Sequence, residues 1–294
     1  MTLKQYVAEE IALDCEEGLL TRREALRRLG LLGLGAAASA TLLAACGDDD
    51  DDAATTTSVL VPTTRGAEAV LGEEISFTGP QGELLGSWAA ATSPKGAVLV
   101  IHENRGLTEH IKSIPPRIAE QGYSALAVDL LSQEGGTAAV GDEGAAQAAL
   151  GGAPTERHVA DLRAGLDELQ RRVPGEALGV IGFCFGGGLT WQLLQAGEDR
   201  LAAAVPFYGP APDDPDFSGA EAAVLAVYAE QDARVNGTRD RAVAALERAQ
   251  LTHEVRTYPG VDHAFFNDTG ARYDADAARQ AFAEVVNWFA EYLA

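Results

Sequence analysis

The sequence predicts an α/β fold in which a mainly parallel central sheet is covered by helices on both faces. Apolar runs recur along the chain without alternating polar residues, which is typical of strands that are buried on both sides. Helical patterns separate these runs, and strand–helix alternation implies right-handed crossovers within one sheet. The apolar runs span residues 97–101, 125–128, 178–181, 202–205 and 223–227.

The other elements are expected around these strands. Residues 75–77 and 84–88 are predicted to form an opening hairpin, because turn-forming residues stand between them. Residues 254–258 are expected to form the last strand. Residues 132–153 are rich in Gly and Ala and show no clear period, so we expect an irregular excursion or cap there. Helical patterns cover residues 110–121, 155–172, 186–196, 236–250 and 271–293.

Residues 1–45 are expected to be an export signal. Arginines cluster at residues 22–28, and an uncharged stretch rich in Leu, Ala and Gly follows. This order resembles a twin-arginine signal. Residues 43–46 read Leu-Ala-Ala-Cys and resemble a bacterial lipoprotein box, which implies cleavage before Cys46 and lipidation of its thiol. We therefore expect an exported, extracytoplasmic protein that a lipid anchors to a bacterial cell membrane.

Two other interpretations of this segment stay open, namely an uncleaved membrane anchor and a chance thiol at Cys46. Residues 46–71 are expected to be a disordered tether, because Asp48 to Asp52 form a block of like charge that stays extended. That block lacks the turn and the backbone ligands of a calcium site. The folded domain is expected to span residues 72–294.

Composition excludes several classes of function. The chain has 294 residues, with 44 acidic and 22 basic side chains and a net charge of −22, which disfavours binding to nucleic acid or to an anionic membrane surface. Three cysteines are too few for a disulfide scaffold or a thiolate zinc site. The five histidines form no His-x-x-x-His pair, so we expect neither a metal nor a cofactor. Membrane contact is expected through the lipid alone.

Chemically capable side chains follow the predicted strands. Ligands of an open parallel sheet bind at the carboxyl ends of its strands, so these positions are candidates for a site. A thiol, several carboxylates and a histidine occur there. The segments that follow strands are residues 102–106, 129, 182–188, 228–232 and 259–263.

Cys184 is predicted to be a nucleophile. Residues 182–186 read Gly-Phe-Cys-Phe-Gly, the Gly-x-nucleophile-x-Gly turn between a strand and a helix, in which larger side chains at the two Gly positions would clash. The helix N-terminus stabilises a thiolate, and the N–H of Phe185 faces a developing oxyanion. A buried, inert cysteine is the alternative. A phosphate-cradling loop is disfavoured, because no Lys-Ser or Lys-Thr follows the glycines.

A base and an orienting acid follow in the chain order that such hydrolases use. His263 comes after the last strand, and Asp232 comes two strands after Cys184. Asp232 would accept a hydrogen bond from one ring nitrogen of His263, while the other nitrogen faces the sulfur. Glu230 and Asp262 are the competing carboxylates. Taken singly, Asp232 could be a helix N-cap and His263 a surface histidine.

These motifs together resemble the dienelactone hydrolase family, the carboxymethylenebutenolidases, within the α/β-hydrolase fold. The resemblance rests on the cysteine elbow, the Asp232 loop, residues 260–266 and residues 102–107, and it covers about residues 72–294. It implies a Cys184–His263–Asp232 triad. It also implies that Glu103 contacts the resting thiol and helps to take its proton, and that the N–H of Asn104 is the second oxyanion donor. A carboxylate beside the thiol would disfavour the oxidation-prone thiolate.

The substrate-binding residues depart from the family pattern. One of the arginines that hold a substrate carboxylate in that family stands four residues after the catalytic histidine, where this chain has Asn267. Arg105 and Arg157 are the candidate replacements. The identity of the substrate, and whether it carries a carboxylate, stay open.

The sequence thus predicts an exported cysteine hydrolase of activated esters or lactones, a small-molecule substrate and no nucleic-acid partner. A thiolate is a good leaving group, so its attack is productive chiefly when the alcohol leaves easily, as an enol does. Two alternatives come from other classes. One is a thiol redox or peroxide-sensing protein that uses Cys184, which would need a second cysteine nearby. The other is a catalytically silent ligand-binding module on the same fold.

Overall fold

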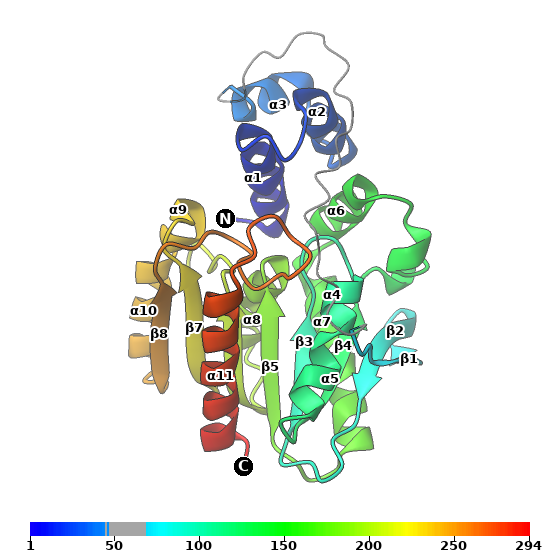
Figure 1. Ribbon diagram of the computed structural model, residues 1–294, viewed down its shortest axis with the longest axis vertical. Helices are drawn as coiled ribbons and strands as arrows, with labels where there is room; N and C mark the ends of the chain where they lie inside the picture. Colours follow the sequence, from blue (N-terminus) through cyan, green and yellow to red (C-terminus); the bar gives the residue numbers. More distant parts are fainter. Residues whose placement is uncertain (45, 47–68) are drawn as a thin grey trace.

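The computed structural model describes residues 1–44, 46 and 69–294 (Figure 1). Its centre is an eight-stranded sheet with strand order β1-β2-β4-β3-β5-β6-β7-β8. Strand β2 runs antiparallel to its neighbours, and the strands from β4 to β8 are parallel. The strands are β1 (Glu73–Gly79), β2 (Gly82–Ala89), β3 (Ala97–Ile101), β4 (Ser124–Asp129), β5 (Leu178–Phe183), β6 (Leu201–Phe207), β7 (Ala223–Ala229) and β8 (His253–Tyr258).

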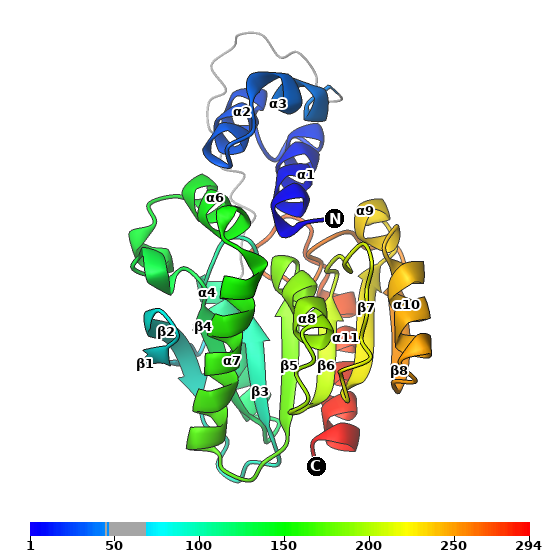
Figure 2. The same cartoon turned by 180° about the vertical axis from the view of Figure 1, so that it is seen from behind.

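Helices cover both faces of this sheet. Helices α5 and α11 pack on one face, and α7 and α8 pack on the other (Figures 1 and 2). The predicted fold class is therefore confirmed. The helices are α1 (Leu3–Glu16), α2 (Arg22–Leu31), α3 (Ala36–Leu42), α4 (Glu109–Lys112), α5 (Ile114–Ala119), α6 (Glu143–Gly152), α7 (Thr155–Arg172), α8 (Phe185–Gln195), α9 (Ala233–Asn236), α10 (Arg239–Arg248) and α11 (Ala275–Tyr292).

Burial follows the sequence patterns. Every residue of β3, β4, β5 and β7 is buried, as continuous apolar runs predict for central parallel strands. The edge strand β8 is largely exposed. Asp274 precedes helix α11 as its N-cap, where its side chain accepts hydrogen bonds from two backbone N–H groups, and the helix buries Ala281, Val285 and Phe289 along one face.

Three predicted segments differ from the structure. The helix expected at 110–121 is divided at Ser113 into α4 and α5, because Pro115 and Pro116 fit only the first turn of a helix. The helix expected at 236–250 is shorter, since α10 begins at Arg239 and ends at Arg248, and the one-turn helix α9 precedes it. The segment 132–153, expected to be irregular, contains two 3₁₀ turns (Ser132–Glu134 and Thr137–Ala139) and the regular helix α6, which Asp142 caps.

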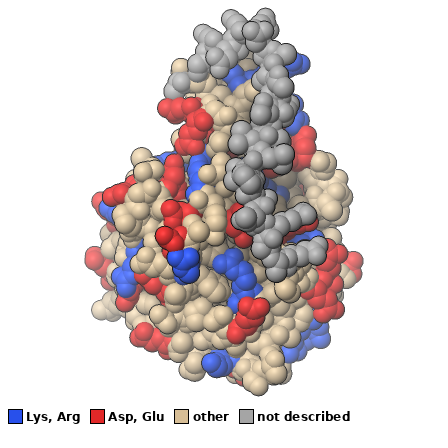
Figure 3. Space-filling view, in the orientation of Figure 1, with Lys and Arg blue, Asp and Glu red and all other residues tan. Residues whose placement is uncertain are grey.

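The N-terminal segment forms helices α1, α2 and α3, which lie above the carboxyl ends of the strands (Figures 1 and 2). Helix α1 packs on α6 and on α8. Within the part of the chain that the structure describes, none of the helices has the length and hydrophobicity that a bilayer-crossing helix requires. The predicted tether falls mainly at residues 47–68, which lie outside the described residues. On the face shown in Figure 3, basic side chains lie among acidic ones.

Candidate active site

Cys184 stands at the sharp turn between β5 and α8. Its backbone has φ 57° and ψ −116°, a conformation that L-residues rarely adopt, as the elbow motif predicts. A Cβ atom added at Gly182 would lie 2.5 Å from the carbonyl carbon of Gly186, so only glycine fits there. The turn places the side chain of Cys184 directly before the first residue of α8, Phe185.

His263 and Asp232 meet beside this turn. Nδ1 of His263 lies 2.6 Å from Oδ2 of Asp232, and both side chains are buried. The other oxygen of Asp232 accepts a hydrogen bond from the N–H of Val235 and so also caps α9. Burial alone would raise the pKa of Asp232, but the adjacent imidazole and these hydrogen bonds hold it below its usual value. Asp232 is therefore both an N-cap and the orienting partner of the histidine ring.

The two competing carboxylates contact backbone instead. Glu230 accepts a hydrogen bond from the N–H of Gly260 at 2.7 Å. Asp262 accepts one from the backbone N–H of His263 at 2.6 Å. Among the described residues, the carboxylate that bonds to Nδ1 of the His263 ring is Asp232.

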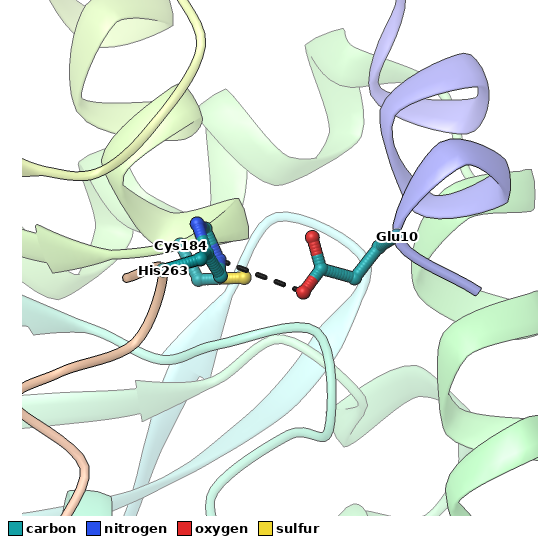
Figure 4. A group of neighbouring side chains, drawn as sticks. All are labelled: Glu10, Cys184 and His263. Carbon is teal, nitrogen blue, oxygen red and sulfur yellow. Dashed lines mark ion pairs between the residues drawn. The ribbon is translucent and has the colours of Figure 1, made fainter. Parts of the chain in front are cut away.

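The structure adds two residues of α1 that sequence reasoning missed. The hydroxyl oxygen of Tyr6 lies 3.2 Å from Sγ of Cys184 and 3.2 Å from Nε2 of His263, so it bridges the two groups. Oε1 of Glu10 lies 3.6 Å from the same Nε2 (Figure 4). Local sequence patterns carry no signal of these contacts, because Tyr6 and His263 are separated by 257 positions.

Burial and neighbouring charges change the pKa values of His263 and Tyr6. Burial alone would disfavour a charged His263, but the negative charges of Glu10 and Asp232 outweigh it and raise the pKa of His263 well above its usual value. Burial raises the pKa of Tyr6 well above its usual value, and the nearby Cys184 and Glu10 add to that effect. With α1 in place, the site thus favours an imidazolium and a neutral phenol.

Three potential metal ligands lie close together in this group. Atoms of Glu10, Cys184 and His263 fall within 4.8 Å of one another. The guanidinium groups of Arg234 and Arg272 stand beside Glu10, where their positive charges oppose a bound cation. The arrangement fits an ion-paired cluster better than a metal centre.

The first strand-end motif is buried beside the thiol, but its contacts differ from the expectation. Oε2 of Glu103 accepts a hydrogen bond from the side-chain amide of Asn267 at 2.6 Å, and Oε1 has no partner among the described residues. The hydrogen-bond partner of the Cys184 sulfur there is Tyr6 rather than Glu103. Asn104 is also buried and lines the same cavity.

Two other polar residues at strand ends hold the backbone. His102 is buried, with Nδ1 2.6 Å from the carbonyl oxygen of Glu103 and Nε2 accepting from the N–H of Leu130 at 3.1 Å. Asp129 accepts hydrogen bonds from the backbone N–H groups of Leu131 and Thr137. These residues fix the loops that carry the site.

A cavity of about 350 Å³ adjoins the thiol between α1 and the strand ends. Of the predicted substrate-binding residues, Arg105 and Asn267 line it. Arg105 is paired with Glu143 of α6 at 3.2 Å. Arg157 is not among the lining residues and pairs with Glu134 at 2.7 Å. Two further arginines, Arg28 and Arg272, line the cavity, and no sequence pattern marks them as candidates.

The remaining cysteines lie apart from this site. Cys15 and Cys46 are buried and contact each other, and burial together with the neighbouring thiol raises the pKa of Cys15 to about 12. The redox alternative needs a second thiol beside Cys184, and the described residues place the Tyr6 hydroxyl there.

The sequence is similar to proteins of the dienelactone hydrolase family. The sequence pattern of the dienelactone hydrolase family matches residues 84–293. A protein of Saccharolobus solfataricus, provisionally named a carboxymethylenebutenolidase, is 29% identical over 248 residues, which cover 72% of this chain and 96% of that protein. A protein of Salmonella typhi with the same provisional name is 31% identical over 211 residues, covering 66% of this chain and 77% of the other.

Solved structures agree with these relatives. The crystal structure of a protein of Klebsiella pneumoniae, provisionally named a dienelactone hydrolase, superimposes with a TM-score of 0.66 at 28% identity. The match covers 75% of this chain and 98% of that protein. Almost the whole of that protein therefore superimposes on about three quarters of this chain.

Proposed function

Since the chain belongs to the dienelactone hydrolase family, and is by that membership a carboxylic ester hydrolase, we propose that Cys184 is its nucleophile. The proposed substrates are activated esters or lactones. One observation carries this proposal: Nδ1 of His263 lies 2.6 Å from Asp232, and the Tyr6 hydroxyl, 3.2 Å from both Nε2 and the Cys184 sulfur, occupies the space between base and thiol. A nucleophile, a base and an orienting acid are thus close together, as such a mechanism requires.

The proposed reaction begins when the site is open to substrate. The Cys184 thiol loses its proton to His263, and the sulfur forms a bond to the carbonyl carbon. The resulting oxyanion is held by the backbone N–H groups of Phe185, at the start of α8, and of Asn104. As the carbonyl re-forms, the C–O bond breaks and the departing oxygen takes the proton from His263.

Water completes the cycle. His263 removes a proton from a water molecule that attacks the acyl-thioester. As this second adduct collapses, the C–S bond breaks and the Cys184 sulfur takes the proton from His263, which regenerates the thiol. The products are a carboxylic acid and an alcohol. Because a thiolate leaves more readily than an alkoxide, acylation succeeds best with an enol or aryl leaving group, which supports activated lactones and esters as substrates.

Glu103 is proposed to assist from beside the thiol. Its Oε1 is buried without a partner among the described residues and lines the same cavity as Cys184, so it is available to accept a proton once the site opens. Arg105 and Asn267 are proposed to contact the substrate, because both line this cavity.

We also propose that the chain is exported and anchored by a lipid on Cys46. The support is the sequence alone: clustered arginines, an uncharged stretch and a Leu-Ala-Ala-Cys box at residues 43–46. Cleavage before Cys46 would remove α1, α2 and α3 and leave Cys184 as the sole free thiol. Metabolic labelling with a fatty acid, compared between the chain and its Cys46→Ala variant, tests this step.

The test of the catalytic proposal compares residues 47–294 with their Cys184→Ala variant on a chromogenic enol or aryl ester. Cys184 is the only cysteine of that segment, so iodoacetamide reports on it alone. We expect the substitution, and prior alkylation, to lower kcat/KM by a factor of about 10³ or more. Turnover that survives both treatments would move the chemistry away from Cys184.

A further inference from the structure

We propose that helix α1 is a tethered plug that closes the active site as long as the N-terminal segment remains attached. The proposal rests on the hydrolase function proposed above and names how that site is regulated. Helix α1, which is acidic and carries Tyr6, binds to a surface formed by the elbow, the His263 loop and α9.

The Tyr6 hydroxyl stands where a substrate must stand. It lies 3.2 Å from both Sγ of Cys184 and Nε2 of His263. A carbonyl carbon under attack must come within about 3–3.5 Å of the sulfur, and its leaving oxygen must reach the imidazole. The phenol already fills that space, and with α1 in place Cys184 is only 3% exposed and His263 is fully buried.

The spacing of residues along α1 shows which face of the helix contacts the active site. Tyr6, Glu10 and Asp14 follow one another at intervals of four residues, and Glu17 comes next after three, so all four lie along one side of the helix. Glu10 and Asp14 are buried. Carboxylates are buried at such positions only when positive groups pair with them, so this face must have a specific partner.

Two arginines of the catalytic domain supply that partner. Arg234 of α9 is ion-paired with Glu10 and donates to the carbonyl oxygen of Tyr6 at 3.1 Å. Its guanidinium also lies 4.3 Å from the centre of the Tyr6 ring. Arg272, in the loop after His263, donates to Asp14 at 2.9 Å and pairs with Glu17 at 2.5 Å.

Apolar side chains pack along and beside the same face of α1. Leu3, Val7 and Ile11 are buried. A Cβ atom added at Gly151 of α6 would lie 3.3 Å from Val7, and one at Gly188 of α8 would lie 3.4 Å from Leu3, so the helices approach closely at both glycines. The excursion at residues 132–153 thus has a role in this arrangement, because its helix α6 is the platform on which α1 rests.

Glu10 also changes the charge around the base. Its Oε1, 3.6 Å from Nε2, adds a negative charge next to the His263 ring, which Asp232 already contacts. Glu10 is thereby one of the groups that raise the pKa of His263. Departure of α1 removes this charge together with the phenol, so the space beside the thiol opens and the ring loses a neighbouring anion.

The experiment uses the full chain and its Tyr6→Ala and Glu10→Gln variants. Glu16→Gln is the matched control, because it makes the same change on an exposed position of the same helix. Iodoacetamide labelling of Cys184 is followed by peptide mass spectrometry, which separates it from Cys15 and Cys46. Hydrolysis of an aryl ester is measured in parallel, and circular dichroism verifies the fold.

We expect Tyr6→Ala to accelerate both labelling of Cys184 and ester turnover by at least about tenfold, since a buried aromatic anchor is lost. Glu10→Gln keeps the shape of the helix and is expected to accelerate both labelling and turnover. In Glu16→Gln, both rates should stay within about twofold of those of the unchanged chain. Faster labelling of the variants, with no ester turnover in any of the proteins including the unchanged chain, would support the plug and refute the proposed hydrolase function. Unchanged labelling in both variants, or turnover that the unchanged chain shows and Tyr6→Ala lacks, would overturn the plug.

Discussion

Replacing Gly182 by Ala tests whether the elbow depends on the close approach of β5 to the start of α8. The new Cβ atom would lie 2.5 Å from the carbonyl carbon of Gly186 and 2.5 Å from Oγ1 of Thr190, and nearer still to the Gly186 carbonyl oxygen. Non-bonded contacts of this kind need about 3.5–4.0 Å, so the backbone must move by roughly 1 Å. Because the obstacle is backbone, no rotamer change can relieve the clash.

The cost follows from that displacement. Overpacking in a well-packed region costs about 1–3 kcal/mol, and we expect the upper end of this range for Gly182→Ala because backbone must shift. For a domain of this size, that loss lowers Tm by about 6–12 °C. The same displacement at Cys184 is expected to reduce kcat by about 10²-fold, since reacting groups tolerate little misplacement.

Thermal unfolding and ester turnover measure these effects. The control is Gly152→Ala, which makes the same substitution at the end of helix α6, where no atom lies within 4 Å of the position that the new Cβ would take. We expect that variant to change stability by less than about 1 kcal/mol, in the stabilising direction. A Gly182→Ala protein as stable and as active as the Gly152→Ala protein would refute the steric account of the elbow.

Three further substitutions have defined outcomes. Asp232→Asn should lower kcat by about 10²–10⁴-fold with little loss of fold, whereas the matched Glu230→Gln should be active; equal activities would place the orienting acid elsewhere. Burial raises the pKa of Asp161 from 3.8 to about 6, so its stabilising contribution is complete below pH 3.8 and is lost as pH rises through 6. In urea unfolding, the free energy of unfolding of Asp161→Asn should therefore exceed that of the unchanged protein by about 3 kcal/mol at pH 8 and equal it at pH 3. A difference that does not depend on pH would contradict this. Asn267→Ala removes the 2.6 Å hydrogen bond to the buried Glu103 and should cost about 1–3 kcal/mol, with the cost largely absent when Glu103 is also Ala.

Where the sequence predicted well, the signal was local. The buried strands are continuous apolar runs, and the elbow is a five-residue motif whose two glycines the backbone requires. The proximity of Cys184, Asp232 and His263 followed from one further rule, that parallel strands bring their carboxyl ends to one edge of the sheet. The catalytic roles of these residues remain predictions.

Where the sequence was insufficient, the deciding contacts join distant segments. The helical character of α6 was missed because its Gly and Ala residues lack a strong polar–apolar period. Two of its glycines, Gly144 and Gly151, lie close to side chains of the N-terminal helical segment, a contact that local sequence does not reveal. The hydrogen bond from Asn267 to Glu103 joins residues 164 positions apart and was not predicted. That pairing depends on how two loops meet, which no local pattern encodes.

The sequence by itself therefore determined the sheet, the helices that cross it, the strained elbow and the set of chemically capable residues at one edge. Each of these depends on the chemistry of a short segment or on the fixed geometry of parallel strands. Only the tertiary structure decided what lies against the thiol. Tyr6 and Glu10 of the amino-terminal segment reach Cys184 and His263 because Arg234 and Arg272 pair with the buried carboxylates of α1 while its apolar side chains pack on α6.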